Sequence, residues 1–119
     1  MMAAMEVPRK YHSTANLLKD GSVLVAGGGV CGSCNANHPD AQIFRPPYLF
    51  NTFGSPATRP VITSSTKEIA PGQNTMTVTV PNVFANKMKF AMVRLSATTH
   101  STNNDQRRLS LNVKSVSGS

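Results

Sequence analysis

The sequence predicts an all-β protein. Its 119 residues include eight Pro and eight Gly, together with many Ser, Thr and Asn, a composition typical of short strands joined by turns. An Asp-Gly dipeptide between two apolar runs near the N-terminus signals a hairpin. Beyond Arg59 the apolar residues alternate with polar ones, which indicates strands with one face on a core. These three observations favour β-strands throughout the chain.

The first predicted element is a hairpin over residues 11–29. Thr14–Leu18 forms its first strand, and Lys19-Asp20-Gly21 forms the turn. Ser22–Ala26 is the second strand, apolar enough that we expect it to be buried on both faces. Gly27-Gly28-Gly29 ends it. Two strands around an Asp-Gly turn, followed by glycines, are the pattern of a kelch propeller blade, which needs neighbouring blades to bury its faces.

Residues 30–58 are predicted to form a loop region that contains one short strand, Ala41–Phe44. After Arg59 four segments have the composition or alternation of strands: Pro60–Thr63, Thr75–Val80, Lys89–Leu95 and Leu109–Val113. Their spacing suggests an immunoglobulin-like sandwich, but such a sandwich needs about seven strands. We therefore predict two regions, 1–58 and 59–119, and expect the fold to be truncated at both ends.

The formal net charge of +7 could indicate a nucleic-acid partner. The twelve Lys and Arg are spread along the chain, and no aromatic residues are interleaved with them as a stacking platform requires. We therefore expect a basic surface and no binding of nucleic acid. No apolar stretch reaches the length of a membrane span, and Met1–Lys10 lacks the pattern of a secretory signal.

Tyr11, His12 and His100 are the candidate metal ligands. Imidazole nitrogen suits copper, and a phenol adds an oxygen donor. Adjacent side chains of a regular strand point to opposite faces, so Tyr11 and His12 could share one ion only from a bend or a strand end. By spacing alone, a given His is more often a structural hydrogen-bonding residue than a ligand. The same structural interpretation is favoured for His38, which precedes Pro39 in a loop.

The pair Cys31-Gly-Ser-Cys34 has three interpretations. A thioredoxin-type redox pair opens a helix in a βαβ unit, which is missing here. Half of a zinc site would need a second pair of ligands, which is also missing. A tight structural disulfide in an extracellular loop is favoured, and it implies an oxidising compartment.

Several motifs, taken in order, resemble the galactose oxidase and glyoxal oxidase family of copper radical oxidases. Those that resemble its last propeller blade are Tyr11–Ala15, Leu18–Gly21, Ala26–Gly29, Cys31–Cys34 and Asn37–Phe44. Those that resemble its C-terminal early-set, immunoglobulin-like domain are Ala57–Pro60 and Thr99–Arg108. The resemblance implies a fragment of a kelch blade over residues 1–58, followed by an incomplete early-set sandwich over 59–119.

The resemblance also implies roles for individual residues. Tyr11 matches the axial tyrosine, which acts as the general base for the substrate's hydroxyl proton. His12 and His100 match the two equatorial imidazole ligands of Cu(II), and Thr99–Arg108 matches the loop that reaches the copper. Cys31 and Cys34 match a disulfide of the family.

The implied enzyme is secreted and oxidises a small primary alcohol, sugar or aldehyde while reducing O2 to hydrogen peroxide. Its radical cofactor, a tyrosine joined to a cysteine, is expected in a propeller domain missing from this chain, so we expect the chain alone to be inactive. Two alternatives remain open. One is a non-catalytic early-set and kelch module that serves binding or structure, and the other is a small Cys-x-x-Cys redox protein.

Overall fold

A computed structural model of the whole chain describes residues 3–29, 37–81, 87–99 and 102–118. The described elements are β-strands, apart from one 3-10 turn. The prediction of an all-β protein is therefore confirmed. Within the described residues, no helix is long and apolar enough to span a membrane.

The chain separates into two compact units. Unit 1 consists of Met1–Ala57 and Val93–Arg108, and unit 2 consists of Thr58–Met92 and Leu109–Ser119. A late segment of the sequence thus packs with the first unit. The division into domains at residue 58 stays a prediction, and each unit is described by itself.

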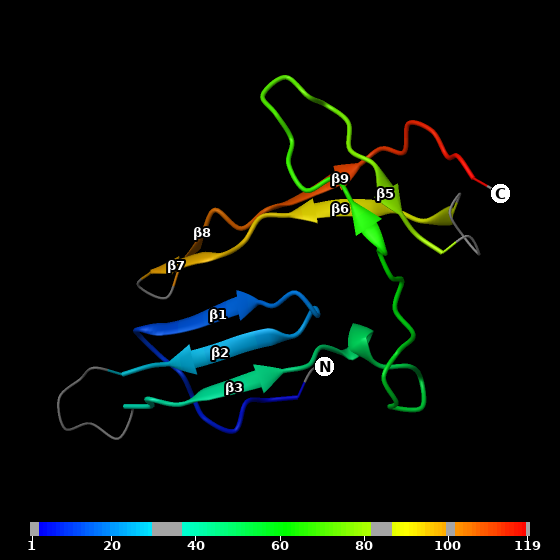
Figure 1. Cartoon of the computed structure of the whole chain (residues 1–119). Helices are drawn as coiled ribbons and strands as arrows, with labels where there is room; N and C mark the ends of the chain where they lie inside the picture. Colours follow the sequence, from blue (N-terminus) through cyan, green and yellow to red (C-terminus); the bar gives the residue numbers. More distant parts are fainter. Residues whose placement is uncertain (1–2, 30–36, 82–86, 100–101, 119) are drawn as a thin grey trace. The chain divides into compact units, whose positions relative to one another are not determined.

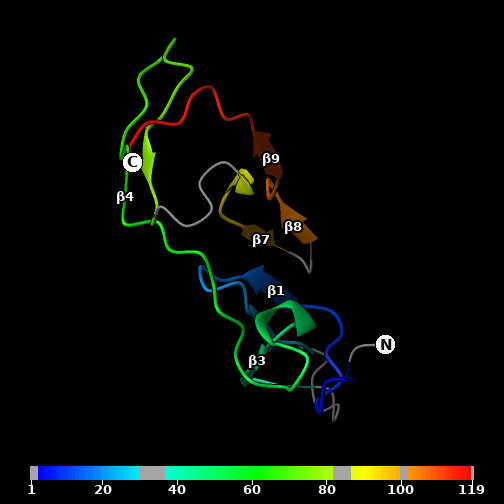
Figure 2. The ribbon, with the colours of Figure 1, turned by 90° about the vertical axis from the view of Figure 1, so that its right-hand side faces the viewer.

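A three-stranded antiparallel sheet forms the centre of unit 1, in the order β1 (Ser13–Leu17), β2 (Val23–Gly27) and β3 (Ala41–Phe44) (Figure 1). All three predicted strands of this region are confirmed, the first two displaced by one residue. The 3-10 turn η1 (Pro47–Leu49) follows β3 (Figure 2). The hydroxyl of Tyr48 in η1 donates a hydrogen bond to the Gly21 carbonyl at 2.5 Å, which ties η1 to the β1–β2 turn.

The Asp-Gly turn between β1 and β2 is also confirmed. Gly21 has a φ of 84°, and its N–H donates to the Leu18 carbonyl at 2.9 Å. One carboxylate oxygen of Asp20 accepts two hydrogen bonds from Ser22, from its hydroxyl at 2.6 Å and from its N–H at 2.9 Å. These hydrogen bonds, first that of the hydroxyl and then that of the N–H, lower the pKa of the Asp20 carboxyl below its usual 3.8.

The burial predicted for β2 is wrong. We expected this strand to be buried on both faces, but its residues are only half-buried. β2 is paired along both edges, which satisfies its backbone but does not cover the side chains on its faces. The same is true more widely, because Pro46 is the only apolar side chain that is buried among the described residues.

A second hairpin of unit 1 was not predicted. It consists of β7 (Ala97–Thr99) and β8 (Thr102–Asn104), which pair antiparallel, and both strands contact β1 (Figure 1). The Thr98 hydroxyl donates to Asn16 Oδ1 at 2.5 Å, and Asn103 Nδ2 donates to the Ala15 carbonyl at 3.5 Å. These two bonds join segments separated by more than eighty residues in sequence.

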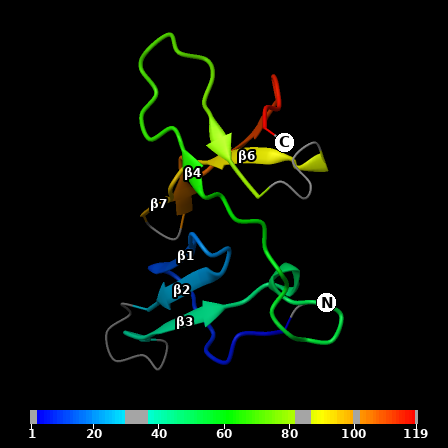
Figure 3. The same cartoon turned by 45° about the vertical axis from the view of Figure 1, so that its right-hand side comes forward.

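Unit 2 holds the ladder of β4 (Ser64–Ser65) with β5 (Val78–Thr79), and most of the ladder of β6 (Phe90–Val93) with β9 (Arg108–Leu111) (Figure 3). The strand predicted at Pro60–Thr63 is wrong, because those residues form no strand and β4 covers only Ser64–Ser65. The other three predicted strands of this region are present but shorter than expected. An apolar hollow lies among Ile62, Ser65, Met76, Val78, Phe90, Ala91, Met92 and Leu111.

Protonation of the Asp20 carboxylate in acid should make the β1–β2 hairpin less stable. Because the pKa of its carboxyl is lower in the folded state, its stabilisation is present above the unfolded pKa and is lost as the pH falls through the folded pKa. NMR titration of the carboxyl should give a pKa below 3.8, and the free energy of unfolding should fall over the same pH range. Asp20→Asn keeps an oxygen acceptor without a titrating group, so this part of the acid loss should disappear. An identical acid profile in both proteins would contradict this account.

Thr98→Val should loosen the contact between the β7–β8 hairpin and β1. The change keeps the side-chain shape but removes the donor to Asn16, which should cost about 1 kcal/mol. Amide hydrogen exchange in β7 and β8 should therefore become faster. Thr75→Val is the matched control, because Thr75 is exposed and belongs to unit 2. Unchanged protection of β7 and β8 in Thr98→Val would show that the hydroxyl does not hold the hairpin.

Candidate metal centre

Tyr11 and His12 occupy a turn immediately before β1. The turn is closed by a hydrogen bond from the Ser13 N–H to the Lys10 carbonyl at 3.2 Å. His12 has a φ of 62°, a left-handed conformation that is uncommon outside glycine. This is the bend that two adjacent ligands require, because a regular strand would direct the two side chains to opposite faces.

The two rings lie side by side as a result. Their centroids are 3.8 Å apart, and their planes are tilted by 41°. Both residues are exposed, Tyr11 by 57%. A phenol oxygen and an imidazole thus share one accessible face of unit 1.

The glycines Gly27–Gly29, at the end of β2, pack against this turn. Gly29 donates its N–H to the Tyr11 carbonyl at 2.8 Å. Gly27 has a φ of 69°, and a Cβ built there would lie 3.0 Å from the His12 carbonyl oxygen. A larger residue would collide with the turn, so Gly27 lets β2 approach it closely.

The His12 ring is held by the same glycine run. Its Nδ1 lies 3.4 Å from the Gly29 carbonyl oxygen. A carbonyl oxygen can only accept, so this contact corresponds to the tautomer with the proton on Nδ1 and the lone pair on Nε2. Metal-binding histidines commonly use one ring nitrogen for such an orienting bond and the other for the metal.

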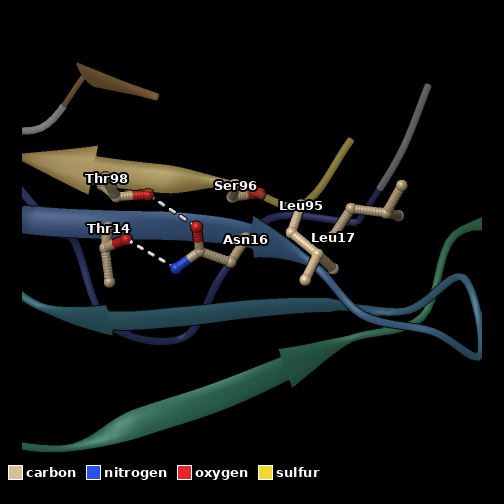
Figure 4. Close-up of a pocket in the computed structure, with 6 residues that line it drawn as sticks. All are labelled: Thr14, Asn16, Leu17, Leu95, Ser96 and Thr98. Carbon is tan, nitrogen blue, oxygen red and sulfur yellow. Dashed lines mark hydrogen bonds between the residues drawn. The ribbon is translucent and has the colours of Figure 1, made fainter. Parts of the chain in front are cut away.

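His100 lies outside the described residues, but the strands on either side of it are described. Thr99 and Thr102 pair across the β7–β8 hairpin. Figure 4 shows β7 antiparallel to β1, with Leu95 near Leu17 and Thr98 near Asn16. The C-terminal end of β7 therefore lies toward the N-terminal end of β1. His12 immediately precedes that end of β1.

The open hollow between β1 and β7 offers no further chemistry. Its lining residues are Thr14, Asn16, Leu17, Leu95, Ser96 and Thr98 (Figure 4). None of them titrates in the physiological range, and Asn16 bonds both threonines, accepting from Thr98 and donating to Thr14 at 2.9 Å. We therefore assign this hollow to the packing of the hairpin.

The remaining candidates contribute little to the described site. Cys31 and Cys34 lie outside the described residues, so their disulfide stays a prediction. His38 donates its backbone N–H to the Gly28 carbonyl at 3.0 Å. In the described parts of the chain, no three His, Cys, Asp or Glu side chains come together.

Arg9 is the residue of this region that sequence reasoning missed. Its side chain is only 1% exposed, whereas we expected the basic residues to form surface charge. No sequence signal distinguished it, because its burial results from the meeting of β2 and β3 beside the turn.

The donor set fits a copper ion as far as it is described. Imidazole nitrogen is a good copper ligand, and a phenol oxygen is a suitable additional donor. Tyr11 and His12 present one of each on the same face, 3.8 Å apart between ring centroids. A third donor would come from beyond this turn.

Comparisons with known proteins identify the family of the chain. Residues 59–119 match the family described as galactose oxidase-like, early set domain. The chain is 40% identical over 112 residues to a galactose oxidase of Gibberella zeae, covering 94% of this chain and 16% of that protein. It is 34% identical over 128 residues to an aldehyde oxidase of Arabidopsis thaliana, covering 98% of this chain and 21% of that protein.

A solved structure extends the similarity to three dimensions. A fungal alcohol oxidase, determined in complex with copper, is 45% identical and superposes with a TM-score of 0.80, covering 92% of this chain and 23% of that one. The chain therefore spans about a sixth to a quarter of the proteins it matches. The matched family covers just over half of its residues, and the chain belongs to the galactose oxidase-like early set domain family.

Proposed function

We propose that this chain supplies Tyr11, His12 and His100 as ligands of a mononuclear copper centre in an alcohol or aldehyde oxidase. The observation that carries the proposal is the left-handed turn at His12, which sets a phenol and an imidazole on one face. The relatives give the chemistry, since they are described as a galactose oxidase, an aldehyde oxidase and a copper-bound alcohol oxidase.

The proposed reaction converts a primary alcohol and O2 into an aldehyde and hydrogen peroxide, so two electrons and two protons leave the substrate. Copper, when bound, would act as a Lewis acid for the substrate oxygen and accept one electron. The second electron needs another acceptor. In this proposal it is a tyrosine–cysteine radical in a propeller region that the chain does not contain.

The chain's own residues would bind the metal and move a proton. His12 would hold the ion through Nε2, while the Gly29 carbonyl keeps its ring in place at 3.4 Å. The Tyr11 oxygen, on an exposed side chain beside that ring, would accept the hydroxyl proton of a substrate bound at the same ion, because a general base must lie within hydrogen-bond reach of its proton. His100 would complete the ligand set from the β7–β8 hairpin.

The finer parts of the proposal concern substrate and location. We assign a small primary alcohol, sugar or aldehyde as substrate, following the family's chemistry. We place the enzyme outside the cell, where a Cys31–Cys34 disulfide would persist.

Copper binding tests the ligand assignment. The 119-residue chain, made without a histidine tag, should bind Cu(II) and give the electron paramagnetic resonance spectrum of a mononuclear site. His12→Ala and His100→Ala should each weaken binding by more than the roughly 10–100-fold typical of residues around the ligands. His38→Ala is the matched control, because only the backbone of His38 bonds Gly28, and it should bind as the parent does. Equal affinity in all four proteins would refute the assignment and favour a non-catalytic module.

The copper-loaded chain by itself should produce no hydrogen peroxide from galactose or methylglyoxal. The physical reason is the electron count, because a single Cu(II) accepts one electron and the oxidation releases two. A coupled peroxidase assay would measure this, with a complete galactose oxidase as positive control. Sustained peroxide production by the chain would contradict the assignment of the radical to a missing region.

A further inference from the structure

The buried guanidinium of Arg9 has an unusual place beside the candidate metal ligands. Arg9 lies two residues before Tyr11, and its side chain is 1% exposed. Arginine is almost never fully buried unless it is paired. The partners of Arg9 therefore explain what its burial does for the fold.

Those partners lie at the adjoining ends of β2 and β3. Arg9 Nη1 donates to the Gly27 carbonyl at 2.8 Å and to the Asp40 carbonyl at 3.2 Å. Arg9 Nη2 lies 2.6 Å from a carboxylate oxygen of Asp40. Gly27 is the last residue of β2, and Asp40 immediately precedes β3. One planar group thus binds the segment before the turn to both strands at the point where their ladder ends.

The turn itself is fixed between this anchor and the glycine run. Gly28 packs directly behind it, because a Cβ at this position would lie 3.3 Å from the Lys10 nitrogen and 3.5 Å from the Arg9 Cα. On the other side of the turn, Gly29 bonds the Tyr11 carbonyl. Arg9 thus fixes the backbone just before the turn, and Gly29 fixes the backbone of the turn itself at Tyr11.

Such restraint is needed because the turn is strained. A left-handed conformation at a residue other than glycine is strained and persists when the surroundings over-determine it. His12 has this conformation, and without it the two rings would diverge. The anchor at Arg9 is among the contacts that oppose relaxation of the turn.

We propose that Arg9 is the positioning residue of the Tyr11–His12 turn, and that it sets both rings in the geometry required for copper through Gly27 and Asp40. Its part in copper binding rests on the function proposed above. Its effect on the ring arrangement does not depend on copper.

The proposal distinguishes arginine from lysine. Arg9 makes two carbonyl hydrogen bonds from Nη1 and an ionic contact from Nη2, which uses two nitrogens of the guanidinium, whereas a lysine ammonium is a single compact centre. Arg9→Lys keeps the charge and could keep the ion pair with Asp40, but it would lose at least one of the two carbonyl bonds. Asp40→Asn is the milder variant, because both main-chain carbonyl bonds remain and only the ionic component is lost.

The first experiment needs no metal. NMR of the parent chain should show cross-relaxation between the ring protons of Tyr11 and His12, whose centroids are 3.8 Å apart. In Arg9→Lys this signal should be lost, and in Asp40→Asn it should be weakened. The matched control is Tyr48→Phe, which removes the bond to Gly21 at the opposite end of the same sheet and should leave the signal unchanged. Urea denaturation would show whether any effect follows overall stability instead.

The second experiment measures Cu(II) affinity of the same variants. Arg9→Lys should weaken binding about 10–100-fold, the range typical of residues that orient ligands, and should alter the paramagnetic spectrum of the site. Asp40→Asn should lower the Cu(II) affinity by a smaller factor, and Tyr48→Phe should bind Cu(II) as tightly as the parent chain.

The outcomes separate the two proposals. Ring cross-relaxation that persists in both Arg9→Lys and Asp40→Asn would overturn the positioning role. If the parent chain binds no copper but the two variants still lose the ring signal, the positioning role is supported and the proposed function is refuted. Copper binding that is unchanged in Arg9→Lys would overturn the link between the anchor and the metal. If Arg9→Lys does not fold, the ring cross-relaxation in Asp40→Asn, which should be weakened, tests the positioning role.

Discussion

The left-handed backbone of His12 is the constraint on which the candidate site depends. It converts two adjacent residues, which a strand would separate, into neighbouring donors on one face. The conformation is held by main-chain contacts with Gly29 and Gly27 and by the Arg9 anchor. The backbone around the site is thus specified by packing against β2 and β3.

The second arrangement that matters is the position of the β7–β8 hairpin on β1. The bond from Thr98 to Asn16 ties this hairpin to the strand that follows His12. Segments that are distant in sequence are thereby joined within one compact unit.

The strands around the site leave their side chains half-buried or exposed. Apart from Pro46, no apolar side chain is buried in the described parts, and several ladders have only two strands, which are marginal on their own. Backbone pairing and polar contacts such as those of Arg9 therefore carry much of the local order.

The sequence by itself determined the β class, the Asp20-Gly21 hairpin and the nature of the donors, because turn chemistry and alternation are local properties. It missed β7 and β8, whose Thr and Asn residues show no apolar alternation, and it overestimated the burial of β2. Only the tertiary structure decided that Tyr11 and His12 share a face and that Arg9 is buried. Both depend on where β2 and β3 end relative to the turn. The position of these strand ends is set by packing between distant segments, so no local sequence pattern predicts it.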